Sequence, residues 1–76
     1  MTFVAFLGHA HLNSQNVAVY QSGDRVTAKV ENVLTGKSYG ARTFDSQTSL
    51  DAWYARLPGT GLGRLYNAMC AILDDD

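Results

Sequence analysis

Hydrophobic and polar residues alternate with a period of two along much of the first 44 residues. The clearest alternation is "RVTAKVE", which is typical of a strand with one face in the core and the other in solvent. Four segments have the composition or the alternation of strands: 3–7, 16–21, 25–31 and 38–44. Turns predicted at "QSGD" (21–24) and "LTGK" (34–37) separate the last three of them. The pattern therefore predicts an antiparallel meander of four strands.

After residue 44 the apolar residues recur at the spacing of a helix. A first helix is predicted with Asp45 as its N-cap and with an apolar stripe at Leu50, Trp53, Tyr54 and Leu57. Pro58 and Gly59 are expected to end it. A second stripe predicts another helix, with Leu62, Leu65, Met69, Ile72 and Leu73. From the two helices we expect five core residues: Leu50, Trp53, Leu65, Met69 and Ile72.

Length and composition narrow the class of protein. The 76 residues predict a single domain spanning 1–76, and 46% hydrophobic with 17% charged residues is typical of a folded chain. The net charge of −1 gives no basic footprint for nucleic acid. The apolar start, 3–7, is too short for a membrane span and lacks the basic flank of a signal peptide, so we expect no membrane association. The single cysteine, Cys70, excludes an internal disulfide and fits a reducing cytoplasm.

The stretch "LPGTGLGRL" (57–65) has three glycines at every second position and raises the question of a phosphate cradle. A phosphate-binding loop follows a buried strand, and a P-loop also requires Gly-Lys-Ser/Thr. This stretch follows a predicted helix and contains no lysine. We therefore interpret it as a hinge, in which Gly59 stops the first helix and Gly61 and Gly63 allow a tight reversal and a close approach of helix backbones.

Two histidines, His9 and His11, would point to the same face if the first strand continued through them. Two ligands do not close a metal site, and the only thiol, Cys70, lies on the second predicted helix. We interpret the histidines as edge or loop residues and Cys70 as a small hydrophobe. Neither histidine has a visible nucleophile partner, and no catalytic residue is predicted.

The strands at 16–21 and 25–31 predict an outward face with a docking patch. If Val17 and Val19 share the core with Val26 and Val30, the outward residues are Asn16, Ala18 and Tyr20, beside Lys29 and Glu31. An aromatic ring next to a carboxylate on an open sheet suits protein recognition. The alternative is that Tyr20 only pairs across the strands, and the pattern alone favours that alternative.

Eight short segments, in unbroken register from end to end, carry a resemblance to a known family: "AHLN" (10–13), "AVY" (18–20), "VENV" (30–33), "GKS" (36–38), "GAR" (40–42), "FDS" (44–46), "LPGTGLGR" (57–64) and "NAM" (67–69). Together they resemble the phage-encoded anti-CRISPR proteins of type I-F that cap the guide-carrying backbone of the Csy surveillance complex. Their order and spacing make the resemblance specific.

The resemblance implies an α+β fold in which a four-stranded antiparallel β-sheet packs against two antiparallel α-helices, in the order ββββαα. It implies a partner, the backbone subunits of the bacterial Csy complex, and an action, obstruction of target DNA from pairing with the guide. It implies neither catalysis nor a metal or cofactor. The tyrosine and glutamate of the family's sheet-face patch fall on Tyr20 and Glu31. The resemblance therefore reverses the preference for cross-strand pairing alone at Tyr20.

The chain departs from the family pattern at two places. Where the family has a functional tyrosine, this chain has Phe6, which keeps the ring and loses the hydroxyl. Binding through ring area survives that change, whereas a hydrogen bond from the hydroxyl does not. The C-terminal "LDDD" (73–76) is acidic where the family end has mixed charge, which would alter the range of partners.

We therefore expect a stoichiometric inhibitor that acts in the host bacterial cytoplasm during phage infection and is monomeric when free. Two other classes are alternatives. A small enzyme or nucleotide-binding module would depend on the glycine stretch and the histidines. A small nucleic-acid-binding module would depend on Arg25, Lys29 and Arg42, and the net charge of −1 argues against it.

Overall fold

The computed structural model describes residues 1–9 and 11–74, so Asp75 and Asp76 of the acidic end lie outside the described residues. Four strands are followed by two helices: β1 (Thr2–Phe6), β2 (Gln15–Ser22), β3 (Arg25–Asn32), β4 (Ser38–Phe44), α1 (Gln47–Ala55) and α2 (Leu62–Asp74). Each predicted element is present; β4 has the predicted ends, and the other elements differ from the predicted ends by at most a few residues.

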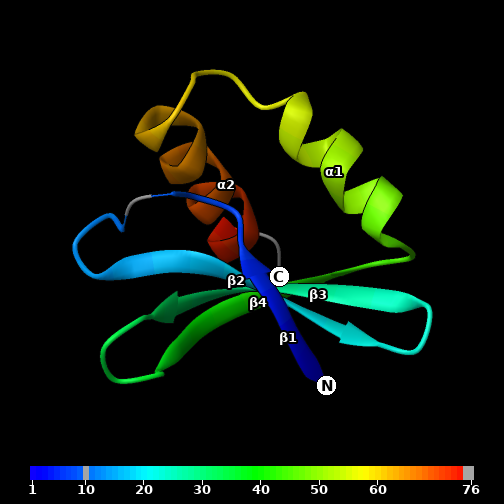
Figure 1. Cartoon of the computed structure of the whole chain (residues 1–76). Coiled ribbons are helices and arrows are strands. Elements are labelled where there is room, and N and C mark those ends of the chain that lie inside the picture. The colour runs from blue at the N-terminus through cyan, green and yellow to red at the C-terminus, as the bar shows by residue number, and fades with distance from the viewer. Residues whose placement is uncertain (10, 75–76) are drawn as a thin grey trace.

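The strands form one antiparallel sheet in the order β1-β2-β3-β4, so each strand pairs with its neighbour in sequence. Both helices lie on the same face of this sheet (Figure 1). Helix α2 packs on β2, β3 and β4, and α1 packs on β3 and β4. The predicted α+β architecture, ββββαα, is confirmed. The opposite face, called the outer face below, is not covered by a helix (Figure 1).

The hairpin of β2 and β3 sets which residues are buried. Its two-residue turn uses Gly23, whose φ of 60° lies in the left-handed region that favours glycine. The resulting register pairs Val17 with Val30 and Val19 with Ala28, and all four side chains are buried. The core consists of residues from β2, β3, β4 and both helices: Val17, Val19, Val26, Ala28, Val30, Phe44, Leu50, Leu65, Ala68, Met69 and Ile72.

Helix α2 contributes most of the helical part of the core. Leu65, Met69 and Ile72 are buried as predicted, whereas Leu62 and Leu73 at the edges of the stripe are exposed. Helix α1 buries only Leu50. The prediction that Trp53 is a core residue is only partly correct, because its ring is half-buried and packs on Phe44 at a centroid distance of 5.1 Å.

The N-cap of α1 is Ser46, not the predicted Asp45. Ser46 has extended backbone angles, and its hydroxyl oxygen accepts a hydrogen bond from the Ser49 backbone N–H at 3.1 Å. This bond satisfies an amide that the first turn of the helix leaves without a partner. Both residues are common N-caps, so composition alone does not distinguish the two positions.

The glycine stretch connects α1 to α2, as the hinge interpretation predicts. Gly59 has φ of +90°, and a Cβ atom there would lie 3.1 Å from the Arg64 backbone nitrogen. The link therefore folds tightly against the start of α2. The predicted role of Gly63 in close packing is wrong, because Gly63 lies inside α2 and a Cβ atom there would have no neighbour within 4 Å.

Replacing Leu65 by alanine should destabilise the fold by about 3 kcal/mol, because this side chain is fully buried and its loss leaves a cavity. The matched control is Leu62→Ala in the same helix, where the side chain is 46% exposed and the cost should stay below about 1 kcal/mol. Urea unfolding of both variants measures the difference. Equal losses would contradict the assignment of the buried face of α2.

Candidate functional site

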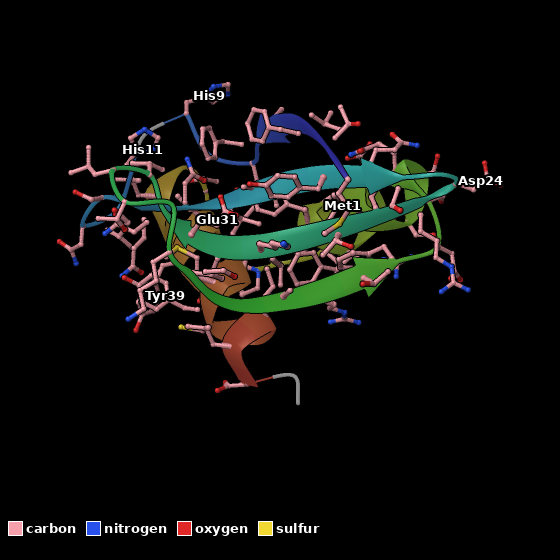
Figure 2. The ribbon with its side chains drawn as sticks, turned by 90° about the horizontal axis from the view of Figure 1, so that it is seen from below. Met1, His9, His11, Asp24, Glu31 and Tyr39 are labelled. Carbon is pink, nitrogen blue, oxygen red and sulfur yellow. The ribbon has the colours of Figure 1, made fainter. Side chains whose placement is uncertain are left out.

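The outer face of the sheet brings Tyr20 and Glu31 together. The Tyr20 hydroxyl donates a hydrogen bond to the Glu31 carboxylate, with distances of 2.9 Å to Oε1 and 2.8 Å to Oε2. Figure 2 views this face from the side opposite the helices and labels Glu31. The residues directly opposite them across the β2–β3 ladder are Thr27 and Asn16, so the two bonded residues are offset along the strands. The phenol ring must therefore lie along the sheet to reach the carboxylate.

The position over which the ring extends is the pair Ala18 and Lys29, which lies between Tyr20 and Glu31 in the register. The Lys29 ammonium lies 5.1 Å from the centre of the Tyr20 ring, within cation–π range. Ala18 is fully buried although it points to the outer face. In the register Ala18 lies between Phe6 of β1 and Lys29 of β3, on the side of Tyr20 toward which its hydroxyl reaches Glu31.

The hydrogen bond to Glu31 raises the pKa of Tyr20 above its ordinary value of 10.0. Burial and the negative charge of Glu31 raise this pKa further, in that order of importance. The phenol therefore remains a donor at neutral pH, and the Tyr20–Glu31 pair presents an oriented ring with a carboxylate at its polar end.

Phe6 also lies on the outer face, opposite Ala18 in the β1–β2 ladder. Its ring is 39% exposed and meets the His11 ring edge to face at a centroid distance of 5.6 Å. All three residues predicted as partner-binding, Tyr20, Glu31 and Phe6, are thus placed on one face. Their predicted role in binding stays a prediction.

Asn16 and Ala18 point to the outer face, as predicted, but both are fully buried there. Asn16 is fully buried, and its side-chain oxygen accepts hydrogen bonds from the backbone N–H groups of Gly8 and Val17. Its amide nitrogen donates to the Gly8 carbonyl at 3.1 Å and lies 3.2 Å from His11 Nδ1. Asn16 therefore fastens the connection between β1 and β2 to the sheet.

The condition for His9 and His11 to share a face, a first strand that continues through them, is not met. The strand β1 ends at Phe6, His11 contacts Asn16, and His9 is exposed beside a cavity. Over residues 1–9 and 11–74, no group of three or more histidine, cysteine or acidic side chains is arranged to hold a metal ion. Cys70 is half-buried in α2, so the prediction of a small buried hydrophobe is only partly correct.

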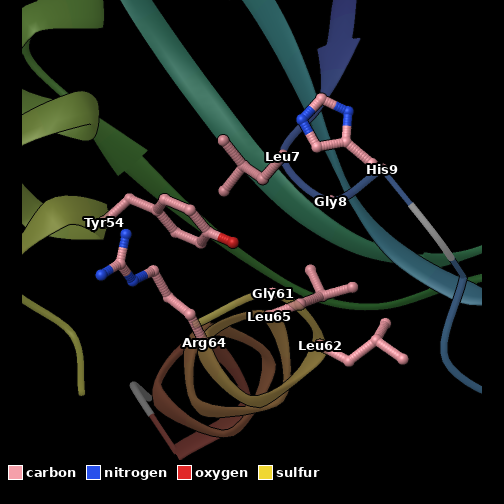
Figure 3. A pocket seen from close by; sticks show the side chains of 8 residues that line it. All are labelled: Leu7, Gly8, His9, Tyr54, Gly61, Leu62, Arg64 and Leu65. Atoms are coloured by element: carbon pink, nitrogen blue, oxygen red, sulfur yellow. The ribbon is translucent and has the colours of Figure 1, made fainter. Parts of the chain in front are cut away.

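A cavity of about 370 Å³ lies between the two helices and the connection after β1 (Figure 3). Its lining residues are Leu7, Gly8, His9, Tyr54, Gly61, Leu62, Arg64 and Leu65. The glycine stretch contributes to this lining, but it follows a helix and its arginine is engaged within the chain. The Arg64 Nε donates to the Gly59 carbonyl at 3.1 Å, and the guanidinium lies 5.8 Å from the Tyr54 ring centre. These contacts favour the structural interpretation of the stretch.

The three basic residues of the nucleic-acid alternative are not all on one face of the sheet. Arg25 and Lys29 are four positions apart in β3 and share the outer face. Lys29 lies over Tyr20 on the outer face. Arg42 pairs with buried Ala28 and stacks on Phe44, with 5.0 Å from the guanidinium carbon to the ring centre, so it lies on the helix side. Within the part of the chain that the structure describes, no helix has the length and apolar character needed to cross a membrane.

Comparison with known proteins identifies the family. The family model described as "Anti-CRISPR protein Acr30-35/AcrF1" matches residues 1–75. A solved structure of anti-CRISPR proteins AcrF1/2 bound to the Csy surveillance complex contains a similar chain, with 51% identity, a TM-score of 0.92, and coverage of 100% of this chain and 97% of that one. The solution structure of Acr30-35 from Pseudomonas aeruginosa phage JBD30 is also 51% identical, with the same coverage and a TM-score of 0.76. No curated protein matches significantly.

The fold and the site define a small α+β protein with aromatic rings and the Glu31 carboxylate on the open face of its sheet. The match over nearly the whole chain is decisive: the chain belongs to the Acr30-35/AcrF1 family of anti-CRISPR proteins. The resemblance seen in the sequence is confirmed.

Glu31→Gln should lower the pKa of Tyr20 toward 10.0, because the carboxylate is the main cause of the increase. The raised pKa means that the stabilising contribution of the Tyr20–Glu31 bond is present below about pH 10 and is lost as the pH rises through the pKa of the folded protein. NMR titration of the Tyr20 ring measures this value. The control is Asp24→Asn, an exposed acid in the β2–β3 turn, which should leave the titration unchanged. An unchanged titration in Glu31→Gln would contradict the assigned contact.

Proposed function

We propose that this chain is a stoichiometric protein inhibitor of the type I-F CRISPR surveillance complex, the Csy complex. The observation that carries the proposal is the 51% identity, over the full chain, to a protein in a solved structure of anti-CRISPR proteins AcrF1/2 bound to that complex. The inhibitor binds the backbone subunits that carry the guide RNA. It acts in the cytoplasm of the host bacterium, without catalysis, a metal or a nucleotide.

The outer face is the binding surface in this proposal. Tyr20 suits an anchor because its hydroxyl is held by Glu31 and its ring lies flat along the sheet, so little side-chain freedom remains to be lost on binding. Phe6 adds exposed ring area, which requires no hydroxyl. These contacts support a role for all three predicted residues.

Charge supports the choice of partner. A protein surface that carries RNA contacts phosphates chiefly through lysine and arginine. The Glu31 carboxylate on the outer face would meet such groups and replace a phosphate charge. A protein seated on the guide-carrying backbone would then prevent target DNA from reaching the guide, so inhibition follows from occupancy alone.

Tyr20→Ala should weaken binding to purified Csy complex by about 2 kcal/mol or more, roughly thirtyfold, as for the anchor residues of other interfaces. The matched control is Tyr66→Ala, which removes an exposed ring from α2 on the opposite side of the sheet. The affinity of each variant is measured on immobilised Csy complex, and circular dichroism checks that both variants are folded. Wild-type affinity in folded Tyr20→Ala would count against the assigned anchor.

Glu31→Lys should abolish inhibition, because the reversed charge would face a basic partner surface. Csy complex preloaded with the wild-type chain should fail to bind target DNA in a gel shift, whereas complex challenged with Glu31→Lys should bind it. Asp24→Lys makes the same charge change at the exposed β2–β3 turn and should inhibit like the wild type. A gel shift with RNA or DNA alone tests the nucleic-acid alternative, and no binding is expected. Full inhibition by Glu31→Lys would show that Glu31 lies outside the interface and that another surface binds the complex.

A further inference from the structure

Strand β1 contains an irregularity that changes which of its residues share a face. Phe3 is opposite Tyr20 and Ala5 is opposite Val19, so Val4 is an extra residue without a partner position in β2. In a regular strand, residues three positions apart point to opposite faces. The extra residue restores the phase, and Phe3 and Phe6 therefore both point to the outer face, opposite Tyr20 and Ala18.

Phe3 lies between the two aromatic residues already assigned to the outer face. Its ring meets Phe6 at a centroid distance of 5.1 Å and Tyr20 at 5.7 Å, both edge to face. The series continues to Lys29 beyond Tyr20 and to His11 beyond Phe6. Phe3 thus joins what would otherwise be two separate contacts into one aromatic row.

The folded core does not explain this ring. Phe3 is 47% exposed and is absent from the core cluster. Every residue of β1 is exposed, and the strand lies at the edge of the sheet, whereas the helices pack mainly on β2, β3 and β4. Large apolar side chains that are exposed and in contact with each other, here Phe3 and Phe6, are characteristic of an interaction surface.

We propose that Phe3 is a further partner-contacting residue, and that the binding surface extends from β2 and β3 across β1 to the edge of the sheet. This inference rests on the proposed function and assigns the Phe3 ring a contact with the same partner, the backbone subunits of the Csy complex. Continuity carries it, because the ring touches both Phe6 and Tyr20.

The chemistry of the aromatic row, Phe6, Phe3 and Tyr20, indicates which side chains of the partner it would contact. Lysine and arginine on an RNA-carrying surface have long aliphatic stems below their charged heads. The stems would pack on the rings of Phe3 and Phe6, while the heads would reach the Glu31 carboxylate. The contact at Phe3 is therefore apolar, and its strength should not depend on salt, unlike the contact at Glu31.

The test measures the affinity of the full chain for purified Csy complex at low and at high salt. Phe3→Ala should weaken binding about tenfold at both salt concentrations. Glu31→Gln should weaken it more at low salt than at high salt. Tyr66→Ala is the control for loss of an exposed ring and should bind like the wild type. Because Phe3 lies outside the core, Phe3→Ala should fold, and a thermal melt checks this.

A double variant separates direct contact from an effect through Tyr20. Phe3→Ala should weaken binding further in a Tyr20→Ala background, and no further loss would show that Phe3 only positions Tyr20, which overturns the inference. Equal affinity of Phe3→Ala and Tyr66→Ala, or a loss that vanishes at high salt, also overturns it. A wild-type chain that does not bind the complex would overturn the proposed function and this inference with it.

Discussion

The register of the β2–β3 hairpin is the constraint on which the rest of the structure depends. The turn at Gly23 fixes which residues face each other, and the period of two then sends Val17 and Val30 toward the helices. The same register sends Tyr20 and Glu31 to the other face. A shift by one residue would exchange the faces, so it would expose the valines and bury the carboxylate. Core and candidate site are therefore specified by one set of pairings.

Much of the fold could be predicted because local patterns and tertiary packing agree. The alternation in β3 predicts one buried face, and the stripe of Leu65, Met69 and Ile72 predicts another. In the structure these faces of β3 and α2 pack together in the core. The position of the α1 cap could not be predicted, because Asp45 and Ser46 are equally suited to it and the backbone angles decide. Trp53 was expected in the core from its spacing. Helix α1, however, packs mainly on the β3 and β4 half of the sheet, and the Trp53 ring stays half-buried.

The outer face was only partly predictable. The period of two places Tyr20 and Glu31 there, but it does not indicate that the phenol reaches along the sheet to Glu31 or that Ala18 is buried. Asn16 is buried because the connection after β1 folds onto it, a long-range contact that the local pattern does not contain. Phe3 was missed because simple alternation assigns it to the face opposite Phe6, and only the extra residue in β1 corrects the phase.

An interruption like that in β1 also occurs at the other edge of the sheet. Val30 is opposite Gly40 and Glu31 is opposite Ser38, so Tyr39 is an extra residue in β4. Both edge strands, β1 and β4, are therefore irregular, whereas the β2–β3 pairing between them is continuous. A regular edge offers a straight row of unpaired backbone groups to the edge of another molecule, and bulges disrupt that row. The two interruptions therefore make both edges of this open sheet poor templates for edge-to-edge pairing, a feature that suits the proposed binding through the outer face by single copies of the chain.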